Sequence, residues 1–486
     1  MHPVCNSFMI AIAAPNQTLG FYRVGTKLSN DVTLAALGTR DPGFLTYAVV
    51  PDPATRVDVG EMDSRFGVQG GFSTKANVIP YLGIRWVLGG YGWKDMEPDH
   101  SGQFTDNRNA ALAKGQQYPS HEAATESVTY NGQPWTVYTL PTLYHSSPSW
   151  ATIPSTQGLI MGALTVPDGE NAWSNYVKAA GLAYAANYPN RQQHIYQITW
   201  EPKYTGNYQG TDEQLVRIYQ IAYQALHQAD PKAVVIGPTS FLDANGGLAF
   251  KTWLKNVLNL GLGKYLDGFS VHPYVFQYPP EPAGMVSAIR EQKSLVNNSA
   301  GKNLPEFGTE HGYTVSDTLT ELDQARGNVR QSLILLGEGY QFDFVFYIAD
   351  FPDKKYGFYY NLNPNVAFGT DKVSPRPVVP AFASETFLLD GYHAVGAIET
   401  LGGTSWGYAF ERNGVDILAL WDYGTTRNVT LNFGVPQVEL YDWMGNHQTL
   451  QTSNGMGTVT LGPEPIYIKG VSPQIWGTSP TLVTSQ

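Results

Sequence analysis

The sequence contains a single cysteine, Cys5, among its 486 residues. One cysteine cannot form an intramolecular disulfide, and it cannot supply a cysteine cluster for zinc or an iron–sulfur centre. Charged residues are also scarce, at 15% of the chain, and 30 basic residues stand against 41 acidic ones, a net charge of −11. This balance disfavours nucleic acids and anionic membrane surfaces as partners, because both call for basic patches.

Long apolar runs are absent as well, so we expect no membrane span. The stretch from Phe8 to Ala14 is too short to cross a bilayer and lacks a basic flank, and we expect an N-terminal strand there rather than a signal peptide. Secretion needs no disulfides in many bacterial enzymes. We therefore expect a secreted or periplasmic protein.

Aromatic residues are abundant, at 13% of the chain, with 30 Tyr and 11 Trp. Sugar rings present flat C–H faces on which aromatic rings pack. All-β regions also use many tyrosines and tryptophans. Composition alone leaves both explanations open.

The chain is longer than one hydrophobic core usually serves, which predicts two domains or one large barrel with an accessory unit. Short strands without helices fill residues 1–62, strands alternate with helix-length segments over 63–390, and strands return over 391–478, before a polar tail at 479–486. We expect the N-terminal strands to join the C-terminal ones in a β-sandwich.

Eight short apolar segments in the middle region read as strands, and this is the number that closes a (β/α)8 TIM barrel. These segments are 65–70, 83–88, 135–140, 196–200, 233–237, 268–272, 306–310 and 342–347. Among the intervening helices the clearest runs from Thr211 to Gln228, where Thr211 and Gln214 have the spacing of a capping box. The predicted fold class is therefore α/β, a barrel with an accessory β-sandwich.

The last part of the chain alternates apolar strands with turn signals. Asn413-Gly414 and Asn454-Gly455 favour tight hairpin turns between such strands. Between barrel and sandwich, the stretch from Phe351 to Pro380 is rich in proline and asparagine and predicts a long loop.

Two glutamates end predicted interior strands, Glu201 after the fourth and Glu310 after the seventh. A carboxylate is costly to bury without a partner or a task. Strands four and seven lie roughly opposite in an eight-stranded barrel, so the two carboxylates can flank a bond over its mouth. Glycosidic bond cleavage needs such a pair, with Glu201 as acid/base and Glu310 as nucleophile. We expect His272 and Tyr274 to hydrogen-bond either Glu310, which would keep it ionised, or a sugar hydroxyl.

Several stretches resemble clan A glycoside hydrolases, most of all family 39 and its exopolysaccharide-degrading members. The stretches are Leu82–Val87 with Trp93–Pro98 and Gly102, Leu140-Pro141 with Pro148–Trp150, Trp200-Glu201-Pro202, Asp267–Tyr274, and Thr309–Gly312. The resemblance covers the barrel. It implies a retaining hydrolase of poly- or oligosaccharides with Glu201 and Glu310 in the roles given above. We expect no metal, because the histidines lack the spacing of a metal site, and no cofactor.

The expected substrate contacts are the polar and aromatic residues near the strand ends. They are Trp93, Tyr144, His145, Trp150, Trp200, Tyr204, His272, Tyr274, Tyr313, Tyr347 and Asp350. Trp200 departs from the clan, which has asparagine before the acid/base, so either another residue contacts the neighbouring sugar hydroxyl or the sugar differs there. That departure favours the alternative function, a non-catalytic carbohydrate-binding or polysaccharide-biosynthesis-associated protein on the same barrel. The sugar, the linkage, endo or exo action and the oligomeric state stay open.

Overall fold

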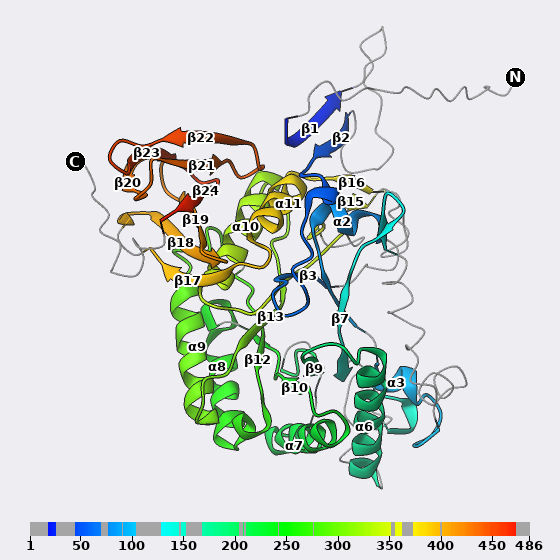
Figure 1. The fold of residues 1–486 in the computed structure, drawn as a ribbon. Helices are drawn as coiled ribbons and strands as arrows, with labels where there is room; N and C mark the ends of the chain where they lie inside the picture. The colour runs from blue at the N-terminus through cyan, green and yellow to red at the C-terminus, as the bar shows by residue number, and fades with distance from the viewer. Residues whose placement is uncertain are drawn as a thin grey trace, which may run out of the picture.

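The computed structural model describes residues 18–25, 44–69, 76–89, 91–103, 128–144, 147–151, 168–203, 208, 210–241, 243–275, 277–350, 355–361, 373–398 and 401–472 (Figure 1). Within these ranges the middle of the chain alternates strands and helices, and the C-terminal part consists of strands. The predicted strand at Phe8–Ala14 lies outside the described residues.

All eight predicted interior strands are confirmed, with slightly shifted ends. The strands of this region are β3 (Phe66–Val68), β4 (Trp86–Leu88), β7 (Tyr138–Leu140), β8 (Thr142–Tyr144), β9 (His194–Thr199), β10 (Ala233–Ile236), β11 (Ser240–Phe241), β12 (Phe269–His272), β13 (Glu306–His311) and β14 (Asp343–Val345). Nearly every residue in them is buried, as expected for parallel strands that are covered on both faces.

The parallel pairings run through two sheets, which adjoin where β7 leads into β8 and where β10 leads towards β12. β3 pairs with β4, β4 with β7, β8 with β9, and β9 with β10. A parallel bridge between Ile236 and Gly268 leads from β10 towards β12, which pairs with β13, and β13 pairs with β14. Finally β14 pairs with β3, where Asp343 lies beside Phe66.

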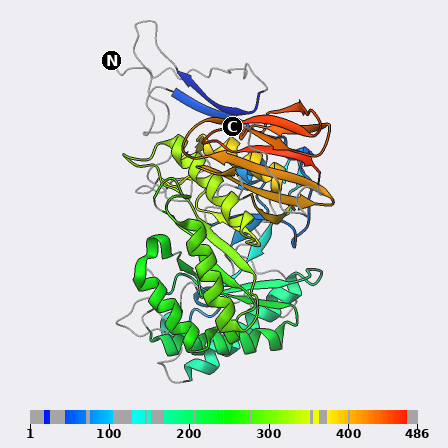
Figure 2. The ribbon, with the colours of Figure 1, turned by 90° about the vertical axis from the view of Figure 1, so that its left-hand side faces the viewer.

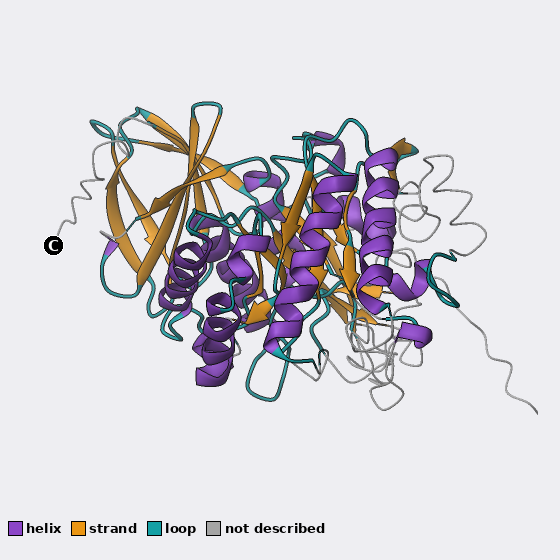
Figure 3. Cartoon of the chain, turned by 90° about the horizontal axis from the view of Figure 1, so that it is seen from below, coloured by secondary structure: helices purple, strands orange, loops and turns teal. Residues whose placement is uncertain are grey.

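Helices follow the strands along the chain and lie around them (Figures 2 and 3). They are α2 (Ile79–Leu82), α3 (Trp93–Met96), α6 (Gly169–Asn187), α7 (Asp212–Ala229), α8 (Asp243–Asn259), α9 (Met285–Ala300), α10 (Glu321–Gly337) and α11 (Val378–Leu389). The predicted capping box of α7 is confirmed. The Thr211 side chain accepts from the Gln214 amide, and the Gln214 side chain accepts from the Thr211 amide.

An apolar cluster fills the space between these strands. It contains the buried residues Trp86, Leu88, Leu140, Ile195, Ile236, Phe307, Phe342 and Phe344, and Trp200 packs against it. Buried polar side chains, among them Thr139, Gln197 and Ser270, also lie within these strands.

The C-terminal strands form a six-stranded antiparallel sheet covered on one face by a two-stranded sheet. The order of the larger sheet is β17-β18-β19-β24-β21-β22, and the smaller is β20-β23. The bounds are β17 (His393–Ala397), β18 (Ser405–Arg412), β19 (Val415–Asp422), β20 (Arg427–Asn432), β21 (Gln437–Tyr441), β22 (His447–Gln451), β23 (Met456–Leu461) and β24 (Ile466–Val471). An apolar cluster that includes Leu418, Leu431 and Val459 joins the two layers as a sandwich.

The predicted hairpin turns are confirmed. Asn413-Gly414 and Asn454-Gly455 all adopt positive φ, between 52° and 80°, as a type I′ turn requires. The other face of the large sheet packs on α10, and one buried cluster contains both Phe66 and Trp421. The boundaries between domains stay a prediction, since this core is continuous.

The N-terminal strands β1 (Gly20–Gly25) and β2 (Phe44–Val49) pair with each other, and among the described residues neither pairs with the C-terminal sheet. The Leu19 amide donates to the Asn446 side chain of that sheet's β21–β22 turn. That β1 and β2 belong to the sandwich stays a prediction. The described part of the chain also contains no helix long and apolar enough to span a membrane.

The predicted loop between Phe351 and Pro380 contains structure that the sequence pattern did not show. β15 (Tyr359–Asn361) and β16 (Val373–Pro375) pair there as antiparallel strands, and α11 begins at Val378. Two further short strands, β5 (Thr129–Tyr130) and β6 (Gln133–Pro134), pair ahead of β7. Short strands of this kind carry too few residues for a period to be seen in the sequence.

Gly337, at the end of α10, provides a test of how the C-terminal sheet is attached. A Cβ at this position would lie 2.2 Å from the Tyr408 ring. We expect Gly337→Ala to lower the free energy of unfolding by about 1–3 kcal/mol through overpacking, measured by denaturant unfolding. The control is the same substitution in a Tyr408→Ala background, where the cost should shrink. An equal cost in both backgrounds would show that the ring contact is not its cause.

Candidate active site

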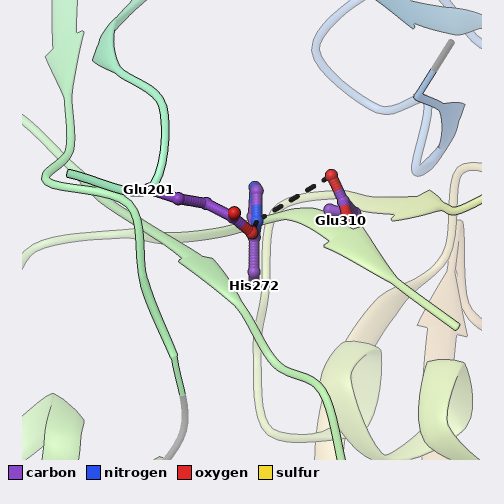
Figure 4. A group of neighbouring side chains, drawn as sticks. All are labelled: Glu201, His272 and Glu310. Carbon is purple, nitrogen blue, oxygen red and sulfur yellow. Dashed lines mark hydrogen bonds and ion pairs between the residues drawn. The ribbon is translucent and has the colours of Figure 1, made fainter. Parts of the chain in front are cut away.

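Glu201, His272 and Glu310 converge at the carboxyl ends of β9, β12 and β13 (Figure 4). The carboxyl ends of neighbouring parallel strands meet at one edge, so the positions of these residues in sequence bring them together. One ligand atom from each residue lies within 4.8 Å of those of the other two. All three side chains are largely buried.

His272 lies between the two carboxylates. Its Nδ1 is 2.5 Å from Glu201 Oε1 and 3.8 Å from Glu310 Oε2. The sequence analysis placed His272 beside Glu310, and the structure puts its hydrogen bond on Glu201 instead. An Nδ1–H donates to the carboxylate at this distance. The ring is thereby oriented, and its charge-assisted bond offsets part of the cost of burying Glu201.

Tyr274 supports the other carboxylate, with its hydroxyl donating to Glu310 Oε1 at 2.5 Å. Burial raises the pKa of Tyr274 well above its usual range, and the Glu310 charge raises it further. The pKa of Tyr347 is also raised, mainly by burial and to a smaller extent by the negative charge of Glu310. The Tyr274 phenol therefore keeps its proton and acts as a hydrogen-bond donor to Glu310.

Trp200 stands edge-on against the His272 ring, with ring centroids 4.4 Å apart. It is half-buried and packs on the apolar cluster inside the strands. The next residue, Glu201, has φ of 35°, a left-handed conformation that side chains other than glycine rarely adopt. Such outliers concentrate at functional sites and motivate a functional hypothesis for the residue.

Trp93 lies in the core rather than where a sugar could reach it. Its side chain is 0% exposed and stacks on Tyr176, and its Nε1 donates to Glu97 Oε2 at 2.8 Å. Burial raises the pKa of Glu97. Trp150 is partly exposed and donates to the Glu97 carbonyl at 2.7 Å. Trp93 and Glu97 thus hold the loop after β4, and only Trp150 of these three presents surface.

Asp350 is also a structural residue by its contacts. It is 0% exposed and binds Arg376 through both carboxylate oxygens, each at 2.7 Å. Tyr313 is 2% exposed and donates to the Gln277 carbonyl at 3.1 Å. The structure brings neither side chain to the Glu201 and Glu310 carboxylates in any contact among the described residues.

Three predicted contacts cannot be placed in full. The backbone of Tyr144 ends β8, where it pairs with Thr199 of β9. His145 and Tyr204 lie outside the described residues. All three stay predictions.

Phe241 is a neighbour of the site that the sequence analysis missed. Its ring centroid lies 6.2 Å from that of His272 and 6.4 Å from that of Tyr274. The sequence offered a signal for it. Phe241 ends β11, shortly after the fifth predicted strand, and no site residue was predicted at the end of that strand. Tyr356 also contacts Tyr274 edge-on at 6.2 Å, but it lies in a segment with no periodicity.

The same three residues are the one group in the described part of the chain with the donor spacing of a metal site. Two carboxylates and one imidazole suit zinc chemically. His272 Nδ1, however, lies within hydrogen-bond distance of Glu201 Oε1, so these two atoms are paired with each other and not directed at a metal ion. The expectation of a metal-free site stays a prediction.

No protein-family model and no curated protein matches this sequence. Solved structures do match. A family 39 glycoside hydrolase from Bacteroides cellulosilyticus WH2 is 20% identical with a TM-score of 0.64, covering 93% of this chain and 88% of that one. In fold, the chain resembles family 39 glycoside hydrolases.

Two further structures agree with this similarity. A family 30 endoxylanase from Clostridium papyrosolvens C71 is 12% identical with a TM-score of 0.54, over 85% of this chain and 97% of that one. A family 39 enzyme from Xanthomonas axonopodis pv. citri is 13% identical with a TM-score of 0.51, over 86% and 95%. The resemblance read from the sequence motifs is confirmed at the level of the fold.

Asp350 offers a direct test of its structural assignment. We expect Asp350→Asn to lower the free energy of unfolding by about 3–5 kcal/mol, because buried Arg376 would lose its bidentate partner and keep only Glu321, at 3.7 Å. The measurement is denaturant unfolding. Glu170→Gln is the matched control, because it breaks an exposed pair with Arg217 and should cost less than about 1 kcal/mol. A cost below that of the control would contradict the structural role.

Proposed function

We propose that this protein is a retaining glycoside hydrolase that acts on a poly- or oligosaccharide through Glu201 and Glu310. The observation that carries the proposal is the approach of these two carboxyl groups within 4.8 Å, although they come from strands β9 and β13 that do not pair with each other. The order of the parallel pairings supports a closed (β/α)8 barrel as the scaffold. Barrel enzymes place their working residues at the carboxyl ends of strands, where both glutamates lie.

The spacing favours retention of configuration. Retaining enzymes hold their carboxyl groups about 5–5.5 Å apart, whereas inverting enzymes leave about 6.5–9.5 Å for a water molecule. Oxygens of Glu201 and Glu310 lie within 4.8 Å of each other. This separation matches the retaining class more closely than the inverting one, so direct attack by one carboxylate fits better.

In the first step Glu310 attacks the anomeric carbon while Glu201 protonates the departing glycosidic oxygen. A covalent glycosyl-enzyme forms and the leaving alcohol departs. In the second step Glu201 takes a proton from water, the water oxygen attacks the anomeric carbon, and the Glu310 ester bond breaks. Both carboxyl groups return to their starting states.

The hydrogen bonds assign the two carboxylates to these roles. Tyr274 donates to Glu310 Oε1, which favours an ionised nucleophile. His272 donates to Glu201 Oε1, so the proton for the leaving oxygen is carried by Oε2. The same bond stabilises Glu201 when it becomes a carboxylate after the first step.

A second candidate is a carbohydrate-binding protein without turnover, and Trp200 in the place of the clan's asparagine favours it. Its packing against His272 and the interior cluster gives Trp200 a structural role. A binding protein has no use for two buried carboxylates held within 4.8 Å. A screen of diverse glycans for reducing-end release separates the two functions.

Replacement of the nucleophile is the central test. We expect Glu310→Gln to lower kcat by about 10⁴-fold or more, because the amide cannot attack the anomeric carbon. Activity is measured as reducing ends released from the glycan found in the screen. Glu306→Gln, on the same strand and paired with Lys293, is the matched control and should retain turnover. Full activity in Glu310→Gln would exclude its role.

Replacement of the acid/base has a different signature. We expect Glu201→Ala to lower kcat by about 10²–10⁴-fold for poor leaving groups and much less for activated aryl glycosides. Added azide should restore turnover of the aryl glycoside and yield a glycosyl azide of retained configuration, read by proton NMR. An azide product of inverted configuration would contradict the retaining mechanism.

A further inference from the structure

A pocket of about 200 Å³ lies on the side of the strands away from Glu201 and Glu310. Gly83 and Arg85, which line it, precede the amino end of β4, whereas both glutamates follow carboxyl ends. The rest of its wall comes from the segment around Arg56, the end of α11, and β18 and β24 of the C-terminal sheet. The pocket is thus built at the seam between the two parts of the fold.

Its lining is basic, although the chain as a whole is acidic with a net charge of −11. Four cationic side chains and one carboxylate line it, namely Arg56, Arg85, Arg412, Lys469 and Asp390. Asp390 Oδ1 already accepts from the Arg65 amide at 2.8 Å and from Ser64 Oγ at 3.3 Å. One oxygen of the Asp390 carboxylate therefore already accepts hydrogen bonds from the two residues that precede β3.

Three of the four cations have no carboxylate within ion-pair distance among the described residues. Across the described ranges, no carboxylate lies within 4.0 Å of Arg56, Arg412 or Lys469. Arg412 donates only to the Asp390 carbonyl at 3.4 Å, and Arg85 contacts Asp58 at the limit of 4.0 Å. Positive charges gathered in a partly enclosed pocket repel each other, and an anion would relieve that repulsion.

Arg56 illustrates this lack of an acidic partner. Its two terminal nitrogens donate to Thr386 Oγ1 at 3.0 Å and to the Ala383 carbonyl at 2.7 Å. Its Nε is buried and has no acceptor among the described residues. Burial lowers the pKa of Arg56 to about 9, attraction by Asp390 opposes this, and repulsion from Arg85 adds to it. Because Nε is closed to solvent, it is the uncompensated positive charge of the pocket, and not this nitrogen, that calls for a counter-ion.

We propose that this pocket is a binding site for a small oxyanion, held by the cationic side chains of Arg56, Arg412 and Lys469. Guanidinium groups match the oxygens of sulfate, phosphate and carboxylate. The anion could come free from solution or as the acidic group of a saccharide. Phe387 stands at the rim, 38% exposed and 5.6 Å from the Arg56 guanidinium, where a sugar ring carrying the anion would pack.

The test is titration of the full chain with sodium sulfate, with ionic strength held constant by exchange for chloride. Calorimetry and thermal unfolding should both show saturable binding of one sulfate, with a rise in Tm that follows from linkage. Arg412→Gln combined with Lys469→Gln should weaken sulfate binding at least tenfold. The matched control is Arg217→Gln with Lys302→Gln, which removes two exposed charges elsewhere and should bind as the unchanged protein does.

A second titration identifies the source of the anion, using glucose 6-sulfate and glucuronate with glucose as the neutral comparison. Tighter binding of an acidic sugar than of sulfate, lost in Phe387→Ala, assigns the site to acidic saccharides. Equal affinity assigns it to the free anion. Saturable binding of none of these, or equal binding by the pocket and control variants, would overturn the proposal. Hydrolysis through Glu201 and Glu310 is needed for none of these measurements.

Discussion

The hydrogen bond from His272 to Glu201 is the interaction around which the site is built. Two carboxyl groups buried within 4.8 Å of each other cannot both ionise without repulsion, and each loses solvation that a hydrogen-bond donor can replace. His272 supplies that donor to Glu201, and Tyr274 supplies it to Glu310. Both donors come from the end of β12 or the residues directly after it, so one strand supports the carboxylates of two others.

This arrangement depends on strand register. β12 and β13 pair with Val271 beside Gly308, which sets His272 level with the residues just before Glu310. On its other side, the parallel bridge from Ile236 to Gly268 fixes β12 relative to β10, and β10 fixes β9. A shift of one residue would turn every side chain of a strand to its opposite face. The apolar cluster beneath the site, with Phe307 and Phe342, holds the register because it would be exposed by such a shift.

Local patterns in the sequence predicted the features that local forces decide. The eight interior strands are continuous apolar runs, the α7 cap is a three-residue relation, and Asn413-Gly414 adopts the conformation that few other pairs allow. Contacts between distant segments left no such pattern. Arg376, the partner of Asp350, is 26 residues away, so Asp350 looked like a free carboxylate. Trp93 was predicted as a sugar contact because Tyr176, the ring on which it stacks, is far from it in the sequence.

The pairing of β14 with β3 has a consequence for biosynthesis. Phe66 finds its neighbour Asp343 only after the greater part of the chain has been made. Until then β3 presents an open edge of unpaired backbone groups, which invites pairing with other chains. Shielding or dilution of the nascent chain would therefore favour correct folding until β14 has been made.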